Sequence, residues 1–165
     1  MDETGFWVGM SRSVARALKG KKAYYLREFY RGQKLTRMGA IKQGEILATK
    51  TIERSMRSDD FLTFIQVNLA PQLKAGDVVV MDNLNSHYRV EVRDIIESVG
   101  ASIEYLPTYS PEFNPIEMMG SQIKSFVRKF RTKTIESLNK IIESAVRLVH
   151  FRCLNHWFTK CCYCT

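Results

Sequence analysis

Residues 77–83, Asp-Val-Val-Val-Met-Asp-Asn, constrain the fold of this chain more than any other stretch. The run from Val78 to Met81 is short, apolar and rich in β-branched residues, a pattern that predicts a buried strand. Asp82 stands where this strand ends, and Asn83 and His87 follow it. Ligands of open α/β sheets bind at the carboxyl ends of the strands. We therefore expect Asp82 to belong to a site, although Asp and Asn also favour an ordinary turn at this place.

A second carboxylate, Glu117, is predicted to lie in the first turn of a helix. Asn114 is a favourable N-cap residue, and Pro115 suits the first helical position. Apolar residues then recur every three or four positions and predict an inward face: Ile116, Met119, Ile123, Phe126 and Phe130. Lys124 and Arg128 share a neighbouring face with Glu117, an arrangement that suits a metal and a phosphate backbone together. The alternative is that Glu117 forms a capping box with Asn114.

These two acidic stretches carry a resemblance to a known family. Asp82-Asn83 with His87, followed by Leu-Pro-Thr-Tyr-Ser-Pro-Glu-Phe-Asn-Pro-Ile-Glu at 106–117, resembles the catalytic domain of bacterial insertion-sequence transposases of the mariner superfamily. Asp82 and Glu117 enclose 34 residues, 83–116, which is the spacing characteristic of that family. The start Met-Asp-Glu-Thr-Gly-Phe is similar to the family's first acidic motif, and Trp157-Phe158 with Cys162-Tyr163 is similar to its carboxyl end.

The resemblance implies an α/β fold of the RNase H-like type, with a mixed sheet flanked by helices. It implies that Asp2, Asp82 and Glu117 are the DDE acids, which in the family hold two divalent ions, Mg²⁺ or Mn²⁺. The implied reaction is DNA strand cleavage and strand transfer at transposon ends, with transposon-end and target DNA as partners. His87 is expected either to lie near the DNA or the attacking water, or to be structural. Asn83, Asn114 and Pro115 are expected to support the site.

Asp2 is preceded by Met1 alone, so we expect most of the family's first strand to be missing. The expected organisation is one DDE-type transposase catalytic domain over residues 1–165, truncated at its N-terminus and without the family's DNA-reading helix-turn-helix domain. The competing hypothesis is a catalytically dead remnant that binds DNA or a full-length partner. Another RNase H-like nuclease, such as a resolvase, would explain the fold but not the proline-rich stretch before Glu117.

The charge of the chain favours a polyanionic partner. Its 25 Lys and Arg residues against 17 Asp and Glu residues give a net charge of +8, which is typical of proteins that bind nucleic acid. Residues 5–22 are predicted to form a basic loop in which Arg16, Lys19 and Lys21 contact DNA phosphates, or are merely solvated. A second copy of the chain is a further candidate partner.

The remaining composition excludes a membrane protein. No apolar run approaches the ~20 residues of a membrane-spanning helix, and the acidic start lacks the order of a signal peptide. We therefore expect a cytoplasmic protein without a membrane partner. Cys153, Cys161, Cys162 and Cys164 do not provide two C-x-x-C pairs, so reduced thiols are favoured over a zinc site.

Further secondary structure is predicted from periodicity and capping signals. An alternating stretch around Tyr24 to Tyr30 predicts a strand, and 35–41 and 45–50 predict a hairpin turning at Lys42-Gln43-Gly44. Helices are predicted after an N-cap at Ser58, ending before Pro71, and over 87–99 with Gly100 as the C-terminal cap. A strand is predicted over 101–106, parallel to the first, and a last clear helix from Thr134. Gly120 is expected to leave a hole in the packing behind Glu117.

Overall fold

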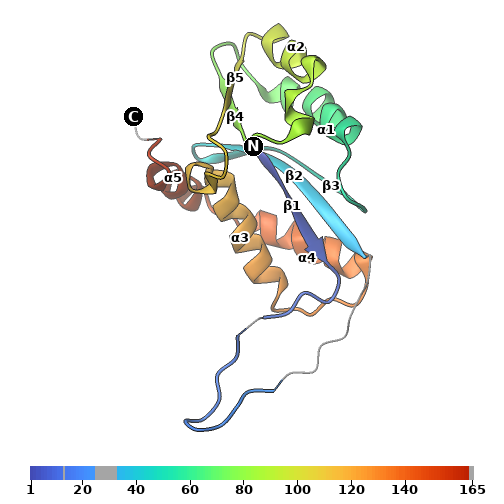
Figure 1. The fold of residues 1–165 in the computed structure, drawn as a ribbon, viewed down its shortest axis with the longest axis vertical. Coiled ribbons are helices and arrows are strands. Elements are labelled where there is room, and N and C mark those ends of the chain that lie inside the picture. Colours follow the sequence, from blue (N-terminus) through green and yellow to red (C-terminus); the bar gives the residue numbers. More distant parts are fainter. Residues whose placement is uncertain (13, 25–32, 164–165) are drawn as a thin grey trace.

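The structure, a computed structural model, describes residues 1–12, 14–24 and 33–163. Its strands are β1 (Asp2–Trp7), β2 (Lys34–Lys42), β3 (Glu45–Ile52), β4 (Val78–Met81) and β5 (Ser102–Tyr105). Its α-helices are α1 (Ser58–Phe64), α2 (Val90–Ser98), α3 (Pro115–Val127), α4 (Ile135–Arg147) and α5 (Phe151–Lys160). Figure 1 shows α3 and α4 along β1 and β2, with β4, β5, α1 and α2 gathered at the opposite end of the molecule.

The strands form two sheets that meet at the N-terminus. β1, β2 and β3 make an antiparallel sheet in that order, while β4 and β5 pair in parallel. The amino group of Met1 donates a 2.7 Å hydrogen bond to the Val80 carbonyl of β4, which links the two sheets. The predicted hairpin and the predicted parallel β4–α2–β5 unit are both confirmed, and Gly44 takes the positive φ of 76° that the hairpin turn requires.

Strand β2 is buried on both of its faces. Residues Leu35 to Ala40 are all buried, although successive side chains of a strand point in opposite directions. Leu35 packs in the apolar cluster of α3, α4 and α5, whereas Met38 packs in the cluster of α1 and α2. β2 is therefore the central layer between two sets of helices.

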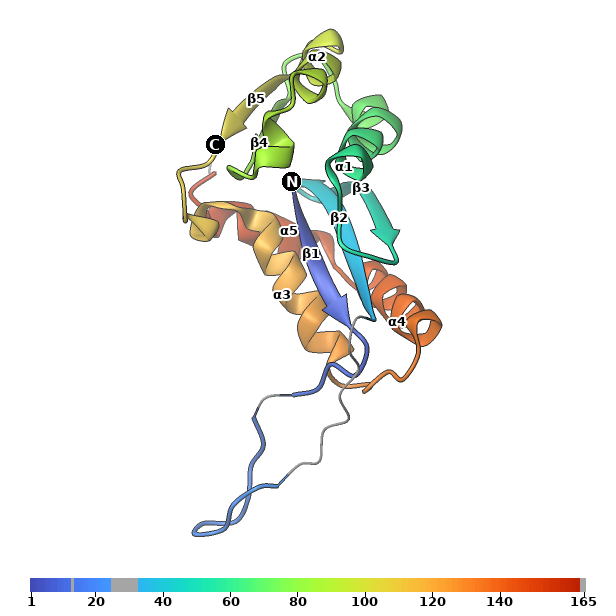
Figure 2. The ribbon, with the colours of Figure 1, turned by 45° about the vertical axis from the view of Figure 1, so that its right-hand side comes forward.

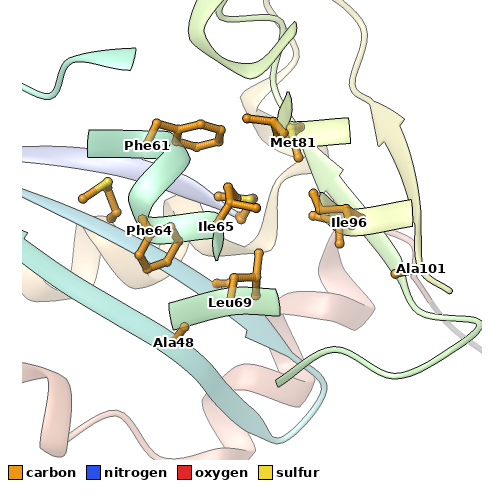
Figure 3. Packing of buried hydrophobic residues seen from close by; sticks show 13 residues of the cluster. Ala48, Phe61, Phe64, Ile65, Leu69, Met81, Ile96 and Ala101 are labelled. Carbon is orange, nitrogen blue, oxygen red and sulfur yellow. The ribbon is translucent and has the colours of Figure 1, made fainter. Parts of the chain in front are cut away.

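The cluster beneath α1 and α2 is built from large side chains that are wholly buried. Phe61 and Phe64 of α1 and Ile65 just after it lie between β2 and β4, and Met81 and Ile96 close the cluster from the other side. Figure 3 shows these side chains pointing toward one another from elements that are far apart in sequence. The apolar stripe predicted for α1 is thus confirmed, and it holds β4 against the antiparallel sheet.

The first strand differs from its prediction. β1 comprises six residues, begins at Asp2 itself and pairs along its whole length with β2, from Asp2 opposite Gly39 to Trp7 opposite Lys34. The expectation that most of this strand is missing is therefore wrong, because six residues of it, beginning at the acid, are present. The basic loop accordingly begins after Trp7 rather than at Gly5.

Several predicted boundaries also move. The N-cap of α1 is Arg57, whose amide donates to Asp60 Oδ2 at 2.9 Å, and not Ser58. Beyond α1 the chain continues as a π-helical turn and then a 3-10 turn that contains Pro71, so the helical path does not end before the proline. His87 lies in a separate 3-10 turn ahead of α2.

Two further predictions have different outcomes, and one helix was not predicted. Tyr24 is exposed and outside any strand, and the rest of that predicted strand, 25–30, lies outside the described residues. Thr134 caps α4 as predicted, its hydroxyl accepting from the Ser137 amide at 3.1 Å. Helix α5 was not predicted, because its short apolar face, mainly Leu154 and Trp157, is interrupted by polar residues.

No helix in the described part of the chain combines the length and the apolar character needed to span a bilayer. This agrees with the absence of a long apolar run in the sequence.

Burial predicts which apolar side chain stabilises the α4 layer. Leu138 is wholly buried, whereas Leu148 at the end of the same helix is 61% exposed. Truncation of Leu138 to alanine should lower the free energy of unfolding by about 2–5 kcal/mol, because a buried cavity replaces the side chain. Leu148→Ala should change it by less than about 0.5 kcal/mol. Equal losses in urea titrations of the two variants would contradict this packing.

Candidate active site

Asp82 lies immediately after β4, as predicted, where the chain leaves the sheet. Asn83 fixes this point because its Nδ2 donates to the Leu106 carbonyl at 2.8 Å and its Oδ1 accepts from the Tyr88 hydroxyl. The ends of the parallel strands β4 and β5 are thereby tied together. The side chain of Asp82 is 41% exposed, so its carboxylate is accessible at this edge.

Asp2 and Glu117 approach one another from β1 and α3. Glu117 is exposed in the first turn of α3, and Pro115 occupies the first helical position as predicted. Asn114 is the N-cap residue, but its side chain makes no capping bond and donates instead to the Met1 carbonyl at 3.4 Å. Within the described residues, Glu117 makes no hydrogen bond to Asn114 beyond that of its own amide, so the capping-box alternative is not observed.

A small cavity of about 20 Å³ separates the two acids from the core, and Asp2, Glu117 and Gly120 all line it. The hole expected at Gly120 is thus present, but Thr4 of β1 covers most of it. A Cβ atom added at Gly120 would meet Thr4 at 3.6 Å, which is ordinary contact. An alanine side chain would therefore fit at Gly120 without moving β1 or α3.

His87 is completely buried between two carboxylates. Its Nδ1 lies 2.8 Å from Asp82 Oδ1, and its Nε2 lies 3.4 Å from Glu3 Oε2. The ring stacks on Phe61 with 4.3 Å between centroids. Nε2 and Glu3 Oε2 are buried without a hydrogen bond, so this second contact is an ion pair only. This burial favours the structural role predicted for His87 over direct contact with DNA.

Negative charge is concentrated around Asp2, because three other carboxylates lie near it. Burial raises the pKa of the Asp2 carboxyl to about 8, and the neighbouring carboxylates of Glu117, Glu3 and Asp82 add to the rise. Burial tends to lower the pKa of His87, but Asp82 and Glu3 outweigh it and raise that pKa to about 9. Burial works against the ionised form of Asp82, yet His87 holds the pKa of this carboxyl below its ordinary value.

The three acids fit a divalent cation by their chemistry. Carboxylate oxygens are the preferred ligands of Mg²⁺ and Mn²⁺. Burial, together with the neighbouring carboxylates, raises the pKa of Asp2, so a bound cation would favour the ionised form of this acid. Over the part of the chain that is described, however, no three acidic, His or Cys side chains already converge as a ligand group. The carboxylates are near enough to influence one another without forming a finished coordination shell.

The predicted DNA-contacting cations lie in two places. Arg16, Lys19 and Lys21 are exposed in residues 14–24, which project from the end of the molecule opposite to α2 (Figures 1 and 2). Lys124, in the last turn of α3, and Arg128, its C-cap residue, are both half-buried. The structure therefore separates the loop cations from the acids and places the α3 cations on the helix that carries Glu117.

Two further residues of this region were not predicted in their observed roles. From the sequence alone, Glu3 is either a surface acid or a substitute metal ligand; in the structure its carboxylate pairs with His87. Successive side chains of a strand point to opposite faces, so a strand at β1 is the sequence signal that Glu3 and Asp2 face different neighbours. Arg37, buried on β2, pairs with Glu143 of α4 at 2.5 Å and donates to Thr49 and Thr51; no sequence signal marked it.

The raised pKa of His87 predicts a pH dependence of stability. Because the folded pKa of about 9 exceeds the ordinary 6.5, His87 stabilises the fold fully below pH 6.5, and this contribution is lost as the pH rises through 9. The His87→Gln variant should lack this loss, which we expect to be roughly 2 kcal/mol in unfolding titrations between pH 6.5 and 9.5.

Asp2 titrates in the wild type and in His87→Gln alike. The quantity to measure is therefore the difference between the two proteins in how steeply the free energy of unfolding changes with pH. His156→Gln, at an exposed histidine of α5, is the matched control and should keep the wild-type slope. Identical slopes for the wild type and His87→Gln would refute the buried ion pairs.

Comparison with known proteins agrees with this geometry. The profile of the DDE superfamily endonuclease family matches residues 1–139. The Mos1 transposase in a paired-end complex with the left transposon end is similar over 97% of this chain and 50% of its own, with a TM-score of 0.80 and 17% identity. The Mos1 mariner paired-end complex with Mn covers 97% of this chain and 51% of its own, with a TM-score of 0.77 and 18% identity.

The catalytic domain of Mos1 mariner transposase, solved alone, covers 81% of this chain and 72% of its own, with a TM-score of 0.68 and 16% identity. A search among curated protein sequences gave no match. The chain spans about half the length of the Mos1 chains in the DNA complexes. At these identities the likeness shows the fold, which confirms the predicted α/β, RNase H-like class. With the family profile matching most of its length, the chain belongs to the DDE superfamily endonucleases.

Proposed function

We propose that this chain is a transposase catalytic domain that cleaves DNA strands and transfers them at transposon ends. The observation that carries the proposal is the convergence of three acids from distant elements: Asp2 of β1 and Glu117 of α3 line one small cavity. Asp82, at the end of β4, is joined through His87 to Glu3, the residue next to Asp2. Structurally similar proteins are Mos1 transposases, solved in paired-end and strand-transfer complexes. In this proposal residues 1–165 form a single catalytic domain that works in the cytoplasm.

Asp2, Asp82 and Glu117 would hold two divalent ions, Mg²⁺ or Mn²⁺. Mos1 mariner paired-end complexes have been solved with Mn and with Mg. When bound, such a pair activates the attacking water or 3′-hydroxyl and stabilises the leaving oxygen of the phosphodiester. The charge of the cations would also lower the pKa of Asp2 toward its ordinary range, because it offsets the neighbouring carboxylates.

Each acid is prepared differently for this role. His87 holds Asp82 Oδ1, which leaves Oδ2 without a hydrogen-bond partner among the described residues and open to an ion. The Glu3 amide donates to Asp2 Oδ1 at 2.7 Å and fixes that carboxylate at the start of β1. Glu117 is exposed on the rigid first turn of α3. Two acids are thus oriented by the protein, and the third stands at the solvent edge.

The cations would bind the phosphate backbone. Lys124 and Arg128 extend along α3 from Glu117 and would contact the strand that enters the site, while Arg16, Lys19 and Lys21 would contact a more distant part of the DNA. Such contacts position DNA without reading its sequence, and they weaken as salt concentration rises. Homodimerisation would bring a second set of these cations to paired ends.

A catalytically inactive, DNA-binding protein is the second candidate. The specific observation in its favour is that, in the described ranges, no three metal-ligating side chains already converge. The net charge of +8 and the exposed loop cations would support DNA binding in either case. The two candidates differ in their dependence on Asp82 and Glu117, which only the catalytic one requires.

A nicking assay on supercoiled plasmid that carries transposon-end DNA tests the proposal. With Mg²⁺ or Mn²⁺ present, the wild-type chain should nick the DNA, and Asp82→Asn or Glu117→Gln should lower the rate by on the order of 10²-fold or more, because charge stabilisation at the reacting phosphate is lost. Binding of the same DNA, measured by fluorescence anisotropy, should change little in these variants.

Asp94→Asn is the matched control, since Asp94 is an exposed acid of α2 away from the site, and it should nick at the wild-type rate. Equal nicking by the wild type and Asp82→Asn would exclude the assigned site. DNA binding without metal-dependent nicking by any of these proteins would establish the second candidate.

A further inference from the structure

Two stretches of the sequence hold all of the excess positive charge of the chain. Residues 118–135 contain five cations and no acid: Lys124, Arg128, Lys129, Arg131 and Lys133. Residues 8–24 also contain five cations and no acid: Arg12, Arg16, Lys19, Lys21 and Lys22. Together these stretches contribute +10 to a chain whose net charge is +8, so the other residues sum to −2. The positive charge is therefore confined to two stretches and is not spread over the whole surface.

The fold brings the two stretches together. The Gly9 amide, just after β1, donates to the Thr132 carbonyl at 2.8 Å, which ties the root of the projecting segment to the connection between α3 and α4. Figures 1 and 2 show this segment leaving the body of the molecule beside the end of α3. The cations of the connection, Lys129, Arg131 and Lys133, are all exposed. A basic surface therefore runs from the last turn of α3, through the connection, to residues 14–24.

Stabilisation of the helices does not explain this charge. Cations favour the C-terminal end of a helix, so Lys124 and Arg128 suit the end of α3 whatever they bind. Lys133, however, lies directly before Thr134, the N-cap residue of α4. A positive charge at that end of a helix opposes the helix dipole. Lys133 is thus placed at an electrostatic cost to the fold, which indicates a role in binding.

The cations of the connection are available for an anionic partner. Among the described residues, neither Lys129 nor Lys133 forms an ion pair with an acidic side chain. The Lys129 ammonium lies 5.7 Å from the centroid of the Phe126 ring, and that ring packs against Phe130 with 4.9 Å between centroids. The aromatic pair therefore positions the ammonium of Lys129 without neutralising it.

We propose that this basic surface binds the phosphate backbone of a DNA duplex that runs along α3 from the acidic site, an inference that rests on the proposed function. Lys129 is twelve residues beyond Glu117, which corresponds to about 18 Å at 1.5 Å per residue. Because the phosphates of one DNA strand follow one another every ~3.4 Å, Lys129 and Lys133 meet the backbone about five base pairs from the phosphate at the acids. Residues 14–24 extend the contact further along the same duplex.

The salt dependence of DNA binding tests the surface. The measurement is fluorescence anisotropy of a labelled transposon-end duplex in EDTA, so that no nicking occurs. Changing Lys129→Gln together with Lys133→Gln should lower the affinity about tenfold at ~0.1 M salt. It should also reduce the slope of log affinity against log salt by about 1–2, because each phosphate contact contributes ~0.9.

A matched control and a stability measurement separate binding from folding. Lys74→Gln together with Arg93→Gln removes two exposed cations outside the basic surface and should keep the wild-type slope. In urea titrations, the Lys129→Gln, Lys133→Gln variant should have an unchanged or higher free energy of unfolding, because Lys133 opposes the dipole of α4. A loss of affinity that accompanies a loss of stability would show a structural role and would overturn the proposal.

Ethylation interference locates the contact relative to the nick. Ethylation of phosphates about five base pairs from the nicked phosphate should weaken binding of the wild type, and this effect should vanish in the Lys129→Gln, Lys133→Gln variant. Interference confined to about two base pairs around the nick, an unchanged salt slope in that variant, or a change of slope only on an RNA duplex of the same sequence would overturn the proposal. If the wild type does not nick but the variant still loses affinity and slope, the proposed function fails and the basic surface stands.

Discussion

The pairing of β1 with β2 is the constraint on which the rest of the molecule depends. It places Asp2 opposite Gly39, and the absence of a side chain at Gly39 lets α3 lie directly on the sheet. A Cβ atom there would come within 3.2 Å of the Ile116 side chain. Ile116 is the residue before Glu117, so the same close approach that packs the helix also brings Glu117 beside Asp2. The register of β1 on β2 thus determines both the apolar cluster beneath α3 and the position of two of the three acids.

The other half of the site depends on a buried histidine. β4 delivers Asp82 to the end of its sheet, but the orientation of its carboxylate comes from His87, which is itself held by Glu3 and by stacking on Phe61. A protonated histidine between two acids moderates their repulsion in a region where burial would otherwise discourage any charge. Glu3 and Asp2 are adjacent on β1, so the strand presents one acid to α3 and the other to His87.

The sequence predicted much of this arrangement because its strongest signals are local. The apolar run before Asp82, the glycine turn at Gly44 and the Asn114-Pro115 start of α3 each follow from the chemistry of neighbouring residues, and each is where it was expected. The three acids could be named because their motif and spacing resemble those of a family. The profile match to DDE endonucleases agrees with that resemblance, while their roles in this chain remain a proposal.

The missed features depend on contacts between distant segments. The direction in which β1 extends from Asp2 is set by its partner β2, more than 30 residues further along the chain, and no local pattern reveals it. The burial of His87 depends on the packing of α1 against β4. The burial of Arg37 depends on its partners Thr49 and Thr51 on β3 and Glu143 on α4. Sequence periodicity identifies faces, but it does not say which faces meet.

The claim at the centre of this account is that Asp2, Asp82 and Glu117 act together on the same ions. Crystals of the chain grown with Mn²⁺, and measured at the manganese absorption edge, address it directly. The account predicts two anomalous peaks roughly 3.5–4 Å apart, enclosed by these three carboxylates. Manganese bound at Asp82 and at Glu117 in separate sites that share no ligand, or no manganese at either acid, would contradict it.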